Sequence, residues 1–151
     1  MRLEEEIGMT QFRSPFQKAY LNILFTGNWL EAQVESLIKP FGISPEQYNV
    51  LRILRGQQGK PINLYKVQER MLSRMSNATR LVEKLRLKGL VTREICEHNR
   101  RKVEIAITQK GLDLLNKLDP LVEEQERALF ERLEAADVES LSEVLDKVRG
   151  N

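Results

Sequence analysis

The sequence contains one cysteine, Cys96, and one histidine, His98, so several classes of protein can be set aside at once. One cysteine cannot form an internal disulfide, and the usual zinc site needs Cys and His ligands that the chain does not have. Only a mostly carboxylate site, or one shared between subunits, is left open, and we expect no metal and no cofactor. A Cys–His pair without further catalytic groups also gives no reason to expect an enzyme. An inert Cys96 is favoured over a redox switch, because nearby His98 is its only local cue.

The sequence also has no apolar run long enough to span a bilayer. Glu4, Glu5 and Glu6 stand where a secretory signal would need positive charge. We therefore expect a cytoplasmic protein with no membrane partner. A length of 151 residues suits one domain with its own core, or one core with an appendage for dimerisation.

The charged residues are unevenly distributed, although the net charge is only +2. Residues 60–110 contain 13 Lys and Arg against five Asp and Glu, a local charge of +8, while the rest of the chain carries −6. A basic centre between acidic ends predicts contact with a polyanion. The alternative is a solvated basic surface that has no partner.

Capping signals predict three helices in the first half of the chain. Ser-Pro pairs at 14–15 and 44–45 predict helices over 15–39 and 45–55, and Asn63 predicts a short helix over 64–70. The first of these is long and has two apolar stripes, which implies two different packing partners.

A helix and a hairpin are predicted next. Ser73 or Ser76 can cap a helix over about 74–88, which ends before Gly89. The spacing of apolar residues then changes to alternation over residues 91–107, as in a β-hairpin with a basic polar tip.

Two helices are predicted at the C-terminal end of the chain. Thr108 can cap the first, which Pro120 should kink or restart. Asp137 can cap a short last helix with an apolar stripe along one side, and this stripe needs another surface to cover it.

This order of elements predicts a winged helix-turn-helix that binds double-stranded DNA. A helix fits the major groove, where exposed donors can reach base edges, and arginines on a hairpin suit a narrow minor groove. The predicted DNA-binding residues lie on the helix over about 74–88 and on the wing over about 91–107: Ser76, Asn77, Thr79, Arg80, Lys84, Arg100, Arg101 and Lys102.

The central part of the chain resembles the MarR family of bacterial regulators. The resemblance lies in SNATRLVEKLRLKGLV over residues 76–91, TRE over 92–94, NRR over 99–101 and ITQKG over 107–111. The family shows a T-R-L-V-x-x-L-x-x-K-G-L-V-x-R run, a D-x-R turn and an L-T-x-x-G helix start. One departure is Asn99, where the family usually has Asp, and it leaves the tip of the wing more positive.

The resemblance implies a winged-helix homodimer that binds a near-palindromic operator, with Arg101 as the arginine of the wing. The expected fold class is mainly α with a small β-hairpin, and the chain would divide into a dimerisation helix over 1–40, a DNA-binding lobe over 41–110 and dimerisation helices over 111–151. Expected dimer contacts are Phe16, Tyr20, Val138, Leu141, Leu145 and Val148.

The resemblance also implies a pocket for a small aromatic effector. Phe25, Trp29 and Tyr48 could line such a pocket, or they could fill the core or the dimer interface. The function expected from these arguments is sequence-specific regulation of transcription, with repression favoured. A dimeric scaffold for protein interactions, without operator binding, is the alternative.

Overall fold

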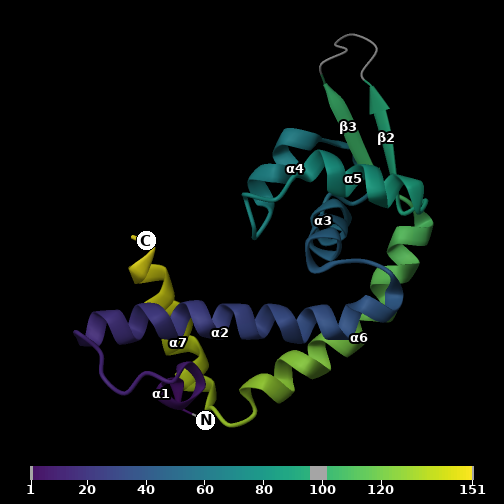
Figure 1. The fold of residues 1–151 in the computed structure, drawn as a ribbon. Coiled ribbons are helices and arrows are strands. Elements are labelled where there is room, and N and C mark those ends of the chain that lie inside the picture. The colour runs from purple at the N-terminus through teal and green to yellow at the C-terminus, as the bar shows by residue number, and fades with distance from the viewer. Residues whose placement is uncertain (1, 96–101, 151) are drawn as a thin grey trace. The chain divides into compact units, whose positions relative to one another are not determined.

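The computed structural model describes residues 2–95 and 102–150, which are mainly helical with a small sheet (Figure 1). The chain forms two compact units, Met1–Leu112 and Asp113–Asn151. Within the described residues no helix is both long and apolar enough to cross a bilayer. The elements are α1 (Leu3–Ile7), α2 (Pro15–Ile38), the 3-10 helix η1 (Lys39–Phe41), α3 (Pro45–Arg55), β1 (Ile62–Asn63), α4 (Leu64–Arg70), α5 (Ala78–Leu87), β2 (Val91–Ile95), β3 (Val103–Ile107), α6 (Gln109–Phe130) and α7 (Ala135–Val148).

The predicted caps of the first helices are confirmed. The Ser14 side chain accepts a hydrogen bond from the backbone N–H of Gln17 at the start of α2. Ser44 and Gln47 form a reciprocal capping box at the start of α3. Asn63 caps α4 by accepting from the Tyr65 N–H at 2.8 Å. Each cap satisfies a backbone donor that a helix start leaves without an intrahelical partner.

Helices α3, α4 and α5 and the sheet of β1, β2 and β3 form what we call the winged lobe. Helix α3 packs against α4, α5 and β3, and α5 also packs against α4 and β2. Its core consists of aliphatic side chains that are almost fully buried: Val50, Leu51, Leu54, Val67, Val82, Leu85 and Ile105. These residues lie on the inward faces of α3, α4 and α5, and Ile105 lies on β3.

The wing is an antiparallel sheet with strand order β1-β3-β2. Strand β2 pairs with β3 from Val91 opposite Ile107 to Ile95 opposite Val103, which confirms the predicted hairpin. The two strands extend beyond α5 in Figure 1. Strand β1 was not predicted, because two residues are too few to show alternation; Ile62 pairs with Ile105.

Several predicted helix boundaries are wrong. Helix α5 begins at Ala78 with Asn77 as its cap, so neither Ser73 nor Ser76 caps it. Helix α6 continues through Pro120, so Pro120 does not restart the helix, and the predicted kink stays a prediction. Glu134, rather than Asp137, caps α7, and Asp137 completes the capping box from the third helical position. The short helix α1 was not predicted from the sequence.

The apolar stripes at the two ends of the chain are exposed. On α2, Phe16 is 85% exposed and Tyr20 is 63% exposed. On α7, Leu141 and Val148 are exposed, while Val138 and Leu145 are half-buried. All six of these residues were predicted to be dimer contacts.

Candidate nucleic-acid interface

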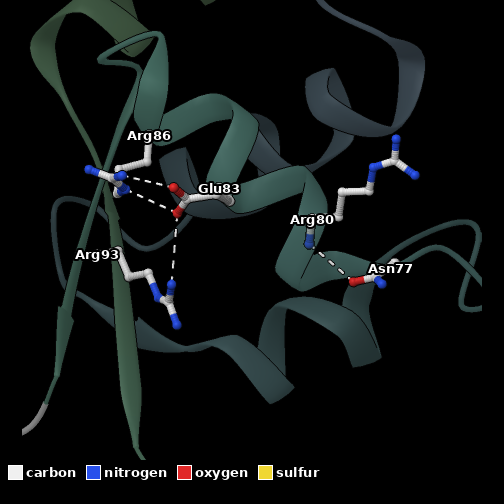
Figure 2. Close-up of polar contacts among 5 residues, drawn as sticks. All are labelled: Asn77, Arg80, Glu83, Arg86 and Arg93. Carbon is white, nitrogen blue, oxygen red and sulfur yellow. Dashed lines mark hydrogen bonds and ion pairs between the residues drawn. The ribbon is translucent and has the colours of Figure 1, made fainter.

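Asn77 sets the start of α5. Its side-chain oxygen accepts a hydrogen bond from the Arg80 backbone N–H at 3.1 Å (Figure 2). A bidentate contact with adenine needs both the oxygen and the nitrogen of the amide. Because the cap occupies the oxygen, the amide nitrogen is the part of Asn77 that is left to donate outward.

The exposed face of α5 carries polar and cationic side chains. Ala78, Val82 and Leu85 are buried on the opposite side of the helix, and Thr79, Arg80 and Lys84 are exposed. The Arg80 side chain points away from the cluster around Glu83 in Figure 2. Within the described part of the chain, neither Arg80 nor Lys84 makes an ion pair. Ser76, the residue before the cap, is half-buried.

Glu83 is the one acidic residue of α5, and two arginines neutralise it. Arg86 donates two hydrogen bonds to its carboxylate, at 2.8 and 3.0 Å, and Arg93 on β2 lies 3.7 Å from the same group (Figure 2). The hydrogen bond from Arg86 lowers the pKa of the Glu83 carboxyl, and the charges of both arginines add to this effect. The cluster therefore keeps one net positive charge, and it connects α5 to the wing.

The turn between α4 and α5, residues 71–77, is held by two amide side chains. Gln68 donates to the carbonyl oxygens of Arg74 at 2.6 Å and Ser76 at 2.8 Å, and its own oxygen accepts from the Ala78 N–H at 3.1 Å. Asn49 on α3 accepts from the Leu72 N–H at 2.9 Å. Gln68 thus satisfies backbone groups on both sides of the cap residue, and the start of α5 is fixed relative to α4.

Sequence reasoning missed Gln68 and Asn49. Both are polar residues near the apolar face of a predicted helix, and Gln68 lies near the end of its helix, before a polar segment. A polar residue in such a place needs a partner, which is the signal that could have found them.

The base of the wing, opposite its tip, is joined by a hydrogen bond to the segment that follows α5. The Thr108 hydroxyl donates to the Gly89 carbonyl at 2.7 Å and accepts from the Gly111 N–H at 3.1 Å, so it caps α6 as predicted. A Cβ atom on Gly111 would lie 2.4 Å from the carbonyl oxygen of Leu90. The Thr-x-x-Gly spacing at 108–111 is therefore a packing requirement where the wing, α5 and α6 meet.

The predicted wing tip is only partly described. Lys102 is exposed at the start of β3, whereas Arg100 and Arg101 lie outside the described residues, as do Cys96, His98 and Asn99. Of the wing cations that the structure describes, Arg93 on β2 pairs with Glu83 of α5, whereas Lys102 lies with Tyr65 and Lys66 of α4 along a pocket beside β1.

The aromatic residues predicted for an effector pocket are not all in one place. Phe25 and Trp29 line a cavity of about 250 Å³ together with Leu3 and Glu6 of α1 and with Asn22 and Thr26 of α2. Tyr48 does not line this cavity; it is buried on α3, where the guanidinium of Arg52 lies 5.7 Å from its ring centre. Helix α1, which the sequence did not predict, supplies one wall of the cavity.

Comparisons with known proteins identify relatives of this chain. The profile of the MarR family matches residues 43–103. The HTH-type transcriptional regulator MhqR of Bacillus subtilis is 29% identical over 111 residues, which cover 74% of this chain and 75% of the relative.

Solved structures are similar over nearly the whole chain. A MarR transcription factor from Planctomyces limnophilus is 32% identical, with a TM-score of 0.71, over 90% of this chain and 98% of that one. MepR of S. aureus, solved in complex with DNA, shares the fold at 19% identity, with a TM-score of 0.76 over 91% of this chain and 98% of that one.

Proposed function

The chain belongs to the MarR family of DNA-binding transcription regulators, and on that premise we propose that it is a homodimeric repressor of a near-palindromic operator. The observation that carries the proposal is the exposed face of α5. Thr79, Arg80 and Lys84 are accessible there, and the one acid on the helix is neutralised by Arg86 and Arg93. Such a face suits the major groove, with the wing beside it near the minor groove.

Base and phosphate contacts are assigned to different residues in this proposal. Arg80 and Thr79 lie on the N-terminal half of α5, the part of a recognition helix that contacts base edges. Lys84, Lys102, Arg100 and Arg101 supply salt-dependent affinity for phosphates, with the wing arginines reaching the minor groove. Asn77 and Ser76 are assigned to the DNA backbone near the start of α5. The oxygen of Asn77 is engaged in the cap, so its amide nitrogen is the group that donates.

Dimerisation is supported by the exposed stripes at the two ends of the chain. Side chains such as Phe16, at 85% exposure, and Val148, at 66%, lie in stripes rather than singly, which is typical of a surface that a partner covers. The proposed division is a dimerisation helix over 1–40, a DNA-binding lobe over 41–110 and dimerisation helices over 111–151. Two copies of α5 would then read half-sites about 34–36 Å apart.

An effector site is supported by the cavity beside Phe25 and Trp29. Two aromatic walls suit a small aromatic molecule, and the Glu6 and Asn22 side chains can orient its polar groups. An effector that binds one arrangement of the dimer better than another would shift the spacing of the two recognition helices, and thereby the affinity for the operator.

Selection of bound DNA from a random pool tests the proposed function. The purified protein should enrich one near-palindromic sequence, and it should bind that sequence at least about 1,000-fold more tightly than a scrambled duplex at physiological salt. The same complex should contain two protein chains by sedimentation. A dimer that enriches no sequence would overturn operator binding and support the scaffold alternative.

A further inference from the structure

Met75 is an apolar side chain that the fold holds in the open. It is 97% exposed, in the turn between α4 and α5. Leu72, three residues earlier in the same turn, is 92% exposed. Neither residue belongs to the stripes on α2 and α7, so the proposed dimer gives no reason for their exposure.

The backbone of the turn fixes the direction of Met75. The Ser76 N–H donates to the Ser73 carbonyl at 3.2 Å, which closes a turn with Arg74 and Met75 at its two central positions. Gln68 binds the carbonyl oxygens on either side, those of Arg74 and Ser76. With both neighbours held, the backbone of Met75 is fixed at the tip of the turn, and its side chain is exposed there.

The turn lies at the end of α5 that enters the major groove under the proposed function. Met75 is two residues before the cap Asn77, and the N-terminal residues of a recognition helix are those that reach base edges. The side chains around it in sequence include the exposed cations Arg74 and Arg80. Neither arginine makes an ion pair with a residue that the structure describes, and such cations beside an apolar tip disfavour an apolar protein partner and favour a polyanion.

The major groove offers one apolar group to such a side chain, the 5-methyl group of thymine. We propose that Met75 contacts a thymine 5-methyl group in each half-site and so contributes to sequence specificity; this inference rests on the proposed operator binding. The thioether is flexible and polarizable, which suits contact with a single methyl group.

Uracil substitution in the selected operator tests this contact. Each thymine is replaced in turn by deoxyuridine, which removes only the methyl group, and the dissociation constant is measured for each duplex. For the wild-type protein, replacing one particular thymine, or its symmetry mate in the other half-site, should lower the affinity by about fourfold, the amount expected for one buried methyl group. Met75→Gln keeps the length of the side chain but adds an amide. Its dissociation constants for the thymine and uracil duplexes should differ by no more than about 1.5-fold, well below the effect of one buried methyl group.

Leu72→Ala is the matched control, because it removes a similarly exposed apolar side chain from the same turn. It should keep the full preference for thymine, and Met75→Leu should keep most of it. Unchanged discrimination in Met75→Gln, or equal loss in Leu72→Ala, would overturn the proposal. So would a wild-type protein that is indifferent to uracil at every thymine, although its operator binding would still stand; failure to select any operator would instead remove the proposed function itself.

Discussion

Arg80 on α5 and Phe16 on α2 are both exposed, but their surroundings in the chain differ. The backbone and the polar groups around Arg80 are held in place by other side chains of the same lobe. These contacts are the cap of Asn77, the three hydrogen bonds of Gln68 and the ion pairs of Glu83. Around Phe16 and Tyr20, an apolar stripe lies open. The winged lobe is closed by contacts within one chain, whereas the exposed stripe of α2 is what supports the proposal that a second copy covers the helices near the chain ends.

The largest effect should come from adding a methyl group at Gly111, where α6 begins against β3 and the segment after α5. In Gly111→Ala, the new Cβ would lie 2.4 Å from the Leu90 carbonyl oxygen and 2.7 Å from a side-chain carbon of Ile107. Because one of these atoms is backbone, relief requires the wing to move, and the free energy of unfolding should fall by about 3 kcal/mol. Urea denaturation measures this change.

Gly27→Ala on α2 is the matched control for that substitution. No atom lies within 4 Å of its added Cβ, and alanine is the better helix former, so this variant should be at least as stable as wild type. If the two alanine variants unfolded at the same urea concentration, the contrast between close packing around Gly111 and open space beside Gly27 would be wrong.

The next largest effect should come from placing charges on the open stripe of α2. The double variant Phe16→Glu with Tyr20→Glu should sediment as a monomer, because carboxylates cannot be buried unpaired in an apolar interface. Loss of the second half-site should then lower operator affinity by about 100-fold or more.

Asn28→Glu places a carboxylate at an exposed polar position of the same helix. It should leave the dimer mass measured by sedimentation and the affinity for the operator unchanged. A double-glutamate variant that still sedimented as a dimer would show that α2 does not contribute its stripe to the interface.

A smaller effect is expected from the turn between α4 and α5. Gln68→Leu removes three hydrogen bonds to the turn and to the first N–H of α5, which should lower the free energy of unfolding by about 2 kcal/mol. Operator affinity should also fall, because the start of α5 is no longer fixed.

Gln57→Leu serves for comparison, since that side chain makes one hydrogen bond, of 3.3 Å, to the carbonyl of Ile53. It should cost less than about 0.5 kcal/mol. Equal costs for the two glutamines would argue that Gln68 does not organise the turn.

The smallest effect is expected at Glu83. Its pKa is lowered by Arg86, so the carboxylate is charged throughout the neutral range, and its pairing is lost only on acidification. Glu83→Gln should leave Arg86 and Arg93 free to contact phosphates, raising affinity for random DNA a few-fold and steepening its salt dependence by about one phosphate contact. Glu126→Gln on α6 removes the same charge from another exposed position and should change neither quantity.

Local signals were enough to predict most of the fold. The caps at Ser14, Ser44, Asn63 and Thr108 were predicted because each one acts within four residues of chain. The alternation over 91–107 predicted the wing. Each of these features depends on residues that lie close together in the sequence.

The remaining features depend on contacts between distant residues. Gln68 reaches Ala78 across ten residues, and Asn49 reaches Leu72 across twenty-three, so neither partner follows from the local pattern. Asn77 caps α5 because the helix starts only at Ala78, and the backbone of Ser73 and Ser76 belongs to the turn that precedes it. Of the predicted interface, Thr79, Arg80 and Lys84 are exposed together, whereas the wing arginines lie outside the described residues.

Operator recognition, as proposed, depends most on Arg80 being a base-reading residue of the winged lobe. The decisive measurement is the ratio of the dissociation constants for scrambled and selected duplexes, compared among wild type, Arg80→Ala and Arg132→Ala, an exposed arginine outside that lobe. Loss of base contacts should reduce the ratio by about 10-fold or more in Arg80→Ala, with little change in Arg132→Ala. A ratio that stayed at the wild-type value in Arg80→Ala would contradict the account.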